Sequence, residues 1–229
     1  MKLKKNLYLA TAIILLASCG AHNRNKINYN ANIIKARECV NNFYFYGSTK
    51  SLDSAYVYLT EVKDGDCADS NRLVNLHLSS VYFLKGDFKD AIKVYESLDA
   101  REFSFPEYKR ILINQIKAKE AGGKKQYAKQ TEYYSDILRD LDAFIDRNIS
   151  TRDSVLKLQD MSSLDRLETE VLLRFGLKYY YLNKVKGSNN VILELDSLQK
   201  TINGNQAYFE FLKKSAIGKD GYHMSVEFE

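Results

Sequence analysis

The segment from Asn71 to Leu98 constrains the fold more than any other part of the chain. Its apolar residues recur at the three- and four-residue spacing of a helix, Gly86-Asp87 interrupts the pattern, and a second helical pattern follows. The spacing therefore predicts two helices joined by a tight turn. One hairpin of this size cannot bury its own apolar face, so neighbouring hairpins have to cover it. The segment predicts an all-α chain of antiparallel helix hairpins.

Small and aromatic residues occupy the positions where the two predicted helices would meet. Small Ser79 and Ala91 let the helices approach closely, and the aromatic side chains fill the space between hairpins. The pattern resembles the tetratricopeptide repeat, with matches at Leu78, Ser79, Tyr82, Gly86, Phe88, Ala91, Tyr95 and Leu98. The resemblance implies a short right-handed solenoid of stacked hairpins. The proline that the family places soon after the second helix is missing, since Pro106 comes late.

Weaker copies of this pattern flank the hairpin. The upstream copy, with a helical hairpin predicted over 31–46 and 51–63, consists of Phe43 to Tyr46, Gly47, Leu52, Ala55, Tyr58 and Leu59. The downstream copy consists of Ile111 to Ala121, Gly122-Gly123 and Ala128. The alanines Ala55, Ala91 and Ala128 are 36 and 37 residues apart, close to the period of about 34 in the family.

Helical patterns also cover the rest of the chain as far as residue 216. They run over 126–147, 163–185, 189–202 and 206–216. Ser162-Ser163 is the expected cap of the second of these, and Asp69 or Ser70 the expected cap of a helix starting near Asn71.

The N-terminus has the order of a secretory signal. Three lysines are followed by an apolar run of 11 residues, Leu7 to Ala17, which is shorter than the ~20 residues that span a bilayer. The stretch Leu16-Ala17-Ser18-Cys19-Gly20 resembles the lipobox of bacterial lipoproteins. The resemblance implies cleavage before Cys19 and attachment of acyl chains such as palmitate, and two or three chains anchor a protein stably. An ordinary secretory signal with an incidental cysteine is the alternative.

These patterns divide the chain into four parts. Residues 1–18 are predicted to be the signal peptide, 19–28 a lipidated tether, 29–217 the helical-repeat domain and 218–229 a C-terminal tail. The nine tether residues after Cys19 reach at most about 30 Å, so the domain is expected to work close to its membrane. Gly20 in place of an aspartate favours the outer membrane, and the lack of an acidic run after Cys19 favours its periplasmic face.

Charge and reactive residues favour a binding protein over an enzyme. Without residues 1–18 the chain has 31 basic and 29 acidic side chains, too even a balance for a nucleic-acid partner. His22, His77 and His223 are scattered, so neither a metal site nor a cofactor is expected. Cys39 and Cys67 could pair in an oxidising compartment, although two separate buried thiols are favoured. The sequence has no motif of nucleophilic or acid–base catalysis.

Two segments are candidates for contact with a protein partner. In the resembling family the first helix of each hairpin forms the concave face, which here predicts a partner-binding surface at Leu73, Leu76, Ser80 and Phe83. The alternative is that the C-terminal helices of the chain cover this face. In the tail, apolar residues alternate with polar ones, which predicts a strand that adds to a partner's sheet, or else an extended tail. The apolar set is Tyr222, Met224, Val226 and Phe228.

The leading interpretation is a membrane-anchored adaptor or scaffold for a protein partner in a cell-envelope assembly. One alternative is an inhibitor or immunity-type lipoprotein that neutralises a toxin or enzyme. Another is a lipoprotein that binds a glycan or small ligand through tyrosines such as Tyr179-Tyr180-Tyr181.

Overall fold

The computed structural model describes residues 25–63, 68–103, 105–159 and 163–217. Ten α-helices and one short 3-10 helix make up these ranges, and no strand occurs in them, which confirms the all-α prediction. The helices are α2 (Asn25–Tyr46), α3 (Thr49–Thr60), α4 (Ala68–Lys85), α5 (Phe88–Ser97), η1 (Ala100–Glu102), α6 (Tyr108–Gly123), α7 (Tyr127–Arg147), α8 (Ile149–Val155), α9 (Arg166–Lys186), α10 (Ser188–Ile202) and α11 (Gln206–Ile217).

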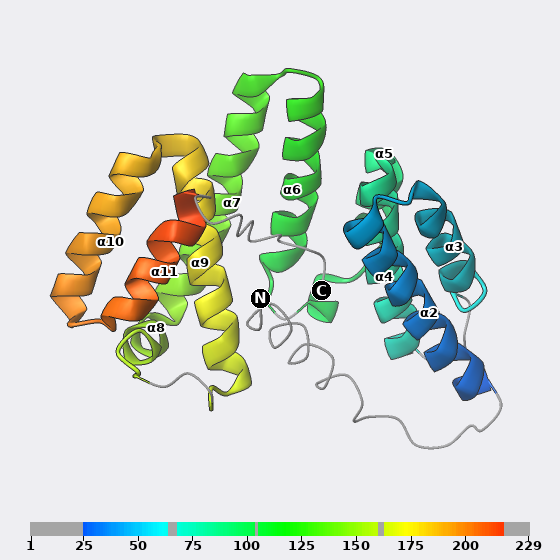
Figure 1. The fold of residues 1–229 in the computed structure, drawn as a ribbon, viewed down its shortest axis with the longest axis horizontal. Coiled ribbons are helices and arrows are strands. Elements are labelled where there is room, and N and C mark those ends of the chain that lie inside the picture. The colour runs from blue at the N-terminus through cyan, green and yellow to red at the C-terminus, as the bar shows by residue number, and fades with distance from the viewer. Residues whose placement is uncertain (1–24, 64–67, 104, 160–162, 218–229) are drawn as a thin grey trace.

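Four antiparallel hairpins have their tight turns at one edge of the molecule. The turns α2–α3, α4–α5, α6–α7 and α9–α10 all lie at the upper edge in Figure 1, and the α6–α7 hairpin projects furthest. Helix α2 begins at the opposite, lower edge. Each hairpin packs against the next through α3 and α4, α5 and α6, and α7 and α9. The right-handed solenoid stays a prediction.

Helix α4 separates two hydrophobic cores. Its Leu78 and Val81 lie in a core shared with α2 and α3, which also contains Leu52 and Leu59. The other face of α4 packs against a larger core that extends from α5 to α11. Burial of apolar side chains on both faces fixes α4 between its neighbours.

The α4–α5 hairpin has the close packing that its sequence predicts. The Ser79 hydroxyl donates a hydrogen bond to the Ala91 carbonyl across the two helices at 2.9 Å. Both residues are fully buried, and Tyr95 is buried beside them. The small side chains therefore bring the backbones together, and the hydroxyl satisfies its polar atom within the contact.

Three helices end in the same backbone turn, although only one of the turns has glycine at the critical position. Gly86, Lys125 and Asn203 have φ values of 83°, 57° and 53° after α4, α6 and α10. At each turn two amide N–H groups donate to carbonyls of the last helical turn, the pattern of a Schellman motif. Gly47 also has positive φ, so Gly47, Gly86 and Lys125 mark hairpin turns 39 residues apart.

This turn spacing corrects the register that the alanines predicted. Ala55 and Ala91 are fully buried, but Ala128 is exposed. Two residues after Ala128, the side-chain amide of Gln130 donates a hydrogen bond to the backbone carbonyl of Ala118 at 3.1 Å. Gln130 therefore occupies in the α6–α7 hairpin the place that Ala91 occupies in α4–α5. In α4–α5 the donor Ser79 is on the first helix and the small Ala91 on the second, whereas in α6–α7 the small Ala118 is on the first helix and the donor Gln130 on the second.

Several helix ends also differ from the sequence prediction. Helix α2 begins at Asn25, inside the predicted tether, and α4 begins at Ala68, before the expected caps. The cap of α9 is Asp165 and not Ser162-Ser163: its carboxylate accepts from the Glu168 amide, and the Glu168 carboxylate accepts from the Asp165 amide. This reciprocal pair is a capping box, which outweighs a lone serine hydroxyl. The short helix α8 is not predicted.

Candidate partner-binding surfaces

The α4 residues predicted to form a concave binding face are largely engaged within the protein. Ser80 is buried and its hydroxyl donates to the Leu76 carbonyl at 3.1 Å. Leu76 and Phe83 are half-buried and pack against the larger core, with the Phe83 ring 5.9 Å from that of Phe88 on α5. Leu73 is half-buried. This face of α4 therefore contributes to the packing of its own hairpin, and partner binding there stays a prediction.

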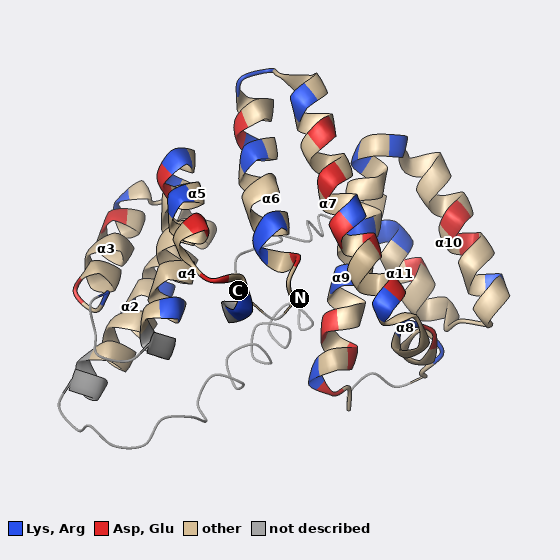
Figure 2. Cartoon of the chain, turned by 180° about the vertical axis from the view of Figure 1, so that it is seen from behind, with Lys and Arg blue, Asp and Glu red and all other residues tan. Residues whose placement is uncertain are grey.

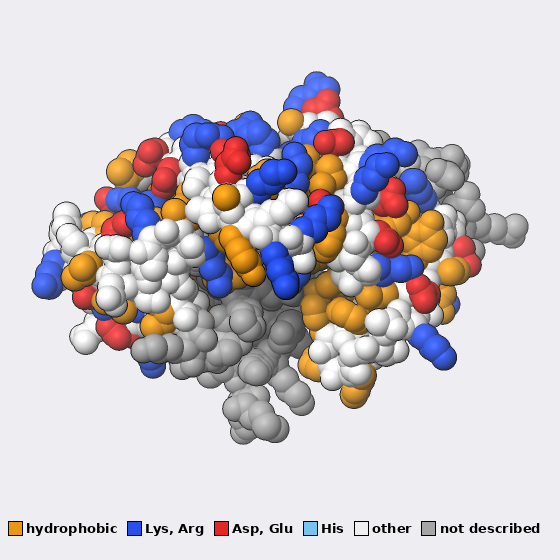
Figure 3. Space-filling model, turned by 90° about the horizontal axis from the view of Figure 1, so that it is seen from above, with side chains coloured by type: hydrophobic (Ala, Val, Ile, Leu, Met, Phe, Trp, Pro, Cys, Tyr) orange, Lys and Arg blue, Asp and Glu red, His pale blue; other side chains and the backbone are white. Residues whose placement is uncertain are grey.

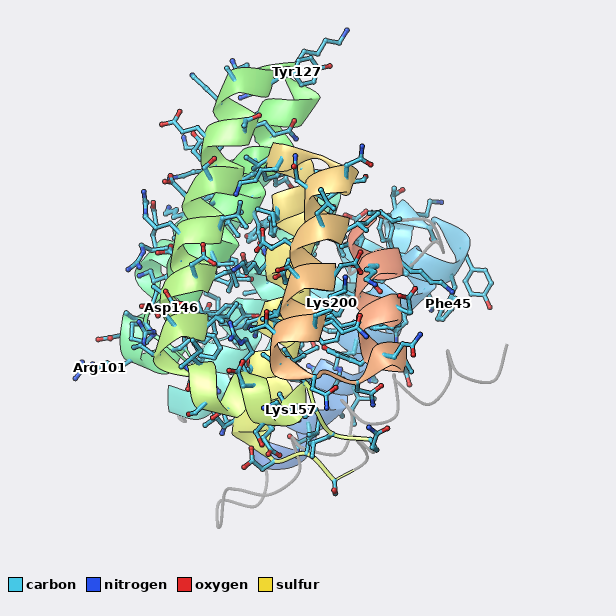
Figure 4. The ribbon with its side chains drawn as sticks, turned by 90° about the vertical axis from the view of Figure 1, so that its left-hand side faces the viewer. Phe45, Arg101, Tyr127, Asp146, Lys157 and Lys200 are labelled. Carbon is cyan, nitrogen blue, oxygen red and sulfur yellow. The ribbon has the colours of Figure 1, made fainter. Side chains whose placement is uncertain are left out.

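An aromatic cluster at the end of α2 is the most exposed apolar feature of the described chain. We define it as Tyr44, Phe45 and Tyr46, which are 44%, 72% and 81% exposed. The Phe45 and Tyr46 rings lie 6.4 Å apart, and Figure 4 shows Phe45 projecting away from the helix bundle. The sequence pattern assigned all of Phe43 to Tyr46 to hairpin packing, but only Phe43 packs against the core.

The tip of the α6–α7 hairpin is a second exposed feature, and it is basic. Lys119, Lys124, Lys125 and Lys129 are all exposed there, and only Lys124 has an ion pair, with Glu120 at 2.6 Å, among the pairs found in the described residues. Figure 2 shows the lysines at the turn, and Figure 3, looking onto this edge, shows basic side chains gathered over it. The sequence predicts a turn here, which the structure confirms with Lys124 following α6. A charged surface was not predicted.

Two ion pairs, each between a buried carboxylate and a half-exposed arginine, hold the lower ends of α6 and α7 together. Asp140, nearly fully buried, accepts two hydrogen bonds from Arg110, at 3.1 and 2.7 Å. Glu107 likewise accepts two from Arg147. These hydrogen bonds hold the pKa of Glu107 below its ordinary value. A carboxylate bound in this way stays ionised, which suits a structural tie better than a general acid.

A third arginine lies against the aromatic side chains next to these pairs. Arg174 on α9 is buried, with its guanidinium 4.2 Å from the centre of the Tyr108 ring and 3.0 Å from a Glu170 oxygen. The ring face and the carboxylate offset part of the cost of burying the charge, while Nε and Nη2 of Arg174 have no hydrogen-bond partner among the described residues. Arg174 thereby ties α9 to the start of α6.

One open groove runs along the outer side of this region between α7 and α9. Its volume is about 560 Å³, and it is lined by apolar Leu138, Leu182 and Val185 and by charged residues including Asp142 and Lys186. The groove brings the end of α9 beside the second half of α7, residues 135–146.

The remaining candidates are placed as follows. Burial lowers the pKa of His77 to about 4, and the positive charge of Arg37 on α2 adds to the shift. Cys39 is half-buried against the N-terminal core, whereas Cys67 lies outside the described residues, so the pairing of the two stays a prediction. Within the described ranges, no three His, Cys, Asp or Glu side chains gather as metal ligands. Tyr179 and Tyr181 are buried, and Tyr180 is half-buried.

The two terminal candidates lie outside the described residues. They are Cys19, the predicted lipidation site, and the tail residues Tyr222, Met224, Val226 and Phe228. Among the described helices, none has the length and apolar character needed to cross a bilayer.

Comparisons of the chain with protein-family models, with curated proteins and with solved structures found no match.

Proposed function

We propose that the chain is a membrane-anchored adaptor that holds a protein partner at the end of its first hairpin. The observation that carries this proposal is the exposure of the aromatic cluster, Tyr44, Phe45 and Tyr46. Neighbouring large apolar side chains in contact with water mark interaction sites, and aromatic residues are enriched in the buried centres of protein interfaces. The partner surface that suits the cluster is apolar and concave, so that it can desolvate the two outer rings.

The proposed anchor is Cys19, acylated after removal of residues 1–18, in the outer membrane with the domain on the periplasmic face. Helix α2 starts at Asn25, six residues after Cys19, which allows at most about 20 Å of extended chain. The 22 residues of α2 then rise about 33 Å to the aromatic cluster. The cluster would therefore be presented into the aqueous compartment, at the far edge from the anchor.

The packing of the charged and aromatic residues favours an adaptor over the other classes. Glu107 and Asp140 are the most deeply buried carboxylates among the described residues, and each accepts two hydrogen bonds from an arginine, as expected of structural ties. Tyr179 and Tyr181, which the sequence offered for stacking on a sugar, are in the core. The exposed aromatic cluster is in contrast available for a protein surface.

Site-specific photo-crosslinking in the native cells tests this proposal. A photo-reactive amino acid replaces Tyr46 in one strain and Leu193, which is 67% exposed on α10, in the control strain. We expect one protein to be captured in stoichiometric yield through position 46 and not through position 193. The additional substitution Phe45→Ser should abolish that capture. Equal capture through both positions, or capture that persists with Phe45→Ser, would contradict the proposal.

A further inference from the structure

The lysines at the α6–α7 turn belong to a larger basic surface. We define the lysine tip as Lys119, Lys124, Lys125 and Lys129, together with Lys184 and Lys186 at the end of α9; all six side chains are exposed. Lys186 lies beside α7, since it lines the α7–α9 groove together with residues of α7. In the sequence from 117 to 130 Glu120 is the only acid, whereas the mature chain as a whole is almost balanced. The edge that carries the α6–α7 turn and the end of α9 therefore has a local excess of positive charge.

The composition of the lysine tip favours an extended anionic layer over a specific carboxylate or phosphate. The four cations at the α6–α7 turn are lysines, which are flexible, strongly hydrated point charges, whereas arginine is the residue that binds an anion with two parallel hydrogen bonds. The nearest exposed arginine in the groove, Arg139, is already paired with Asp136. The end of the α6–α7 hairpin projects beyond the neighbouring hairpins, where it can meet an extended surface (Figure 1).

The apex of the lysine tip carries an exposed tyrosine. Tyr127 is 65% exposed, and Figure 4 shows it at the top of the hairpin. Tyrosine rings prefer the headgroup level of a bilayer, where the ring contacts apolar groups and the hydroxyl stays in water. Lysines around a protruding tyrosine are thus suited to an anionic membrane surface.

The lysine tip and the start of α2 lie at opposite edges of the molecule (Figure 1). Helix α2 alone spans about 33 Å between these edges, more than the extended chain between Cys19 and Asn25 can reach. A bilayer that holds Cys19 would therefore lie on the side away from the lysine tip.

We propose that the lysine tip binds the anionic lipid headgroups of a second membrane surface, facing the one that holds Cys19. This inference rests on the proposed anchoring. The adaptor would then connect two lipid surfaces, with the exposed rings of Phe45 and Tyr46 holding a protein between them. Binding through lysines at an anionic surface weakens as salt screens the charges.

A vesicle-capture experiment tests the inference on the full chain. The lipidated protein is placed in immobilised phosphatidylcholine vesicles, and fluorescent target vesicles contain either phosphatidylcholine alone or phosphatidylcholine with phosphatidylglycerol. The tip variant carries Lys124→Gln, Lys125→Gln and Lys129→Gln. The matched control carries Lys63→Gln, Lys157→Gln and Lys200→Gln, which remove three exposed lysines near the opposite edge.

We expect the wild type and the control to capture phosphatidylglycerol vesicles and not phosphatidylcholine vesicles. Each lysine near an anionic surface strengthens the binding constant for that surface about fivefold, so the loss of three lysines should reduce the number of captured vesicles at least about tenfold. Raised salt should release the captured vesicles. Undiminished capture by the tip variant, or an equal loss in the control, would overturn the inference. Capture of polyglutamate-coated beads but not of phosphatidylglycerol vesicles would also overturn it and point to an acidic protein.

The anchoring is scored separately, by whether the chain stays with the phosphatidylcholine carrier vesicles. If it does not, the anchoring proposal fails, and flotation of the free chain with phosphatidylglycerol vesicles tests the lysine tip with the same variants. The loss expected for the tip variant is the same in that format. Equal flotation of the tip variant and the control would then overturn the inference.

Discussion

The Glu107 carboxylate accepts two hydrogen bonds from the Arg147 guanidinium, at 2.8 and 2.7 Å, and so joins the start of α6 to the end of α7. Glu107 is 8% exposed, and the hydrogen bonds from Arg147 lower its pKa in the folded protein. A carboxylate with a lowered folded-state pKa adds stability above its unfolded pKa, and this stability is lost as the pH falls through the folded pKa.

Replacing Glu107 by glutamine should therefore lower the free energy of unfolding by about 2 kcal/mol at neutral pH. The difference from wild type should shrink as the pH falls from the ordinary glutamate pKa of about 4.3, at which the unfolded chain takes up the proton, through the lowered pKa of the folded carboxyl. Urea denaturation over a pH series measures this. Exposed Glu132, replaced by glutamine, is the control and should change little. A difference for Glu107→Gln that stays constant down to acid pH would show that the ion pair contributes nothing.

His77 should make the fold sensitive to mild acid. Its pKa of about 4 lies below the unfolded value of about 6.5, so the unfolded chain binds the proton first as the pH falls. Stability should therefore decrease between about pH 6.5 and pH 4, by up to about 3 kcal/mol. Denaturation of wild type and His77→Gln over this range isolates the contribution of the histidine. An NMR titration that gives His77 an ordinary pKa would contradict the prediction.

The shared backbone turn predicts opposite effects for two substitutions. Lys125→Gly should stabilise the protein by about 1 kcal/mol, because glycine adopts positive φ without the steric cost of a side chain. Gly86→Ala should destabilise it by a similar amount, since nothing but the backbone conformation opposes the added methyl group. Chemical denaturation of both variants measures the pair. Effects of the same sign would mean that the two turns are not equivalent.

The same chemical change should have different consequences at two phenylalanines. Phe83→Ser should cost about 2 kcal/mol or more, because Phe83 packs against the larger core and the Phe88 ring. Phe45→Ser should change the stability by less than about 0.5 kcal/mol, because Phe45 is 72% exposed. Thermal unfolding compares them directly. Equal losses of stability would show that the aromatic cluster is part of the core and not a binding surface.

The sequence predicts the central hairpin well because local features define it. Ser79 and Ala91 are small, and Gly86 is the residue best suited to a turn with positive φ. The conformation of the next turn is not predictable in the same way, since Lys125 adopts positive φ without being glycine. Residue type matches Ala128 to Ala91, whereas the residue that is structurally equivalent to Ala91 is the larger Gln130.

The surfaces proposed for binding could not be predicted from periodicity. Phe43 and Phe45 are both aromatic and two residues apart, but a helix turns by about 100° per residue and so directs them to different faces. Which face is buried depends on where α3 and α4 pack. The basic character of the α6–α7 tip depends in addition on the end of α9, which lies about 60 residues further along the chain.

The anchor is the premise of both the adaptor and the second-membrane proposals, and the mass of the mature protein tests it most directly. Protein extracted with detergent from the membranes of its own cells is analysed intact and as N-terminal peptides. We expect residues 1–18 to be absent and Cys19 to carry the mass of two or three acyl chains, with Cys19→Ser abolishing that added mass. A mature chain that begins elsewhere, or a Cys19 without acyl groups, would contradict the anchored adaptor.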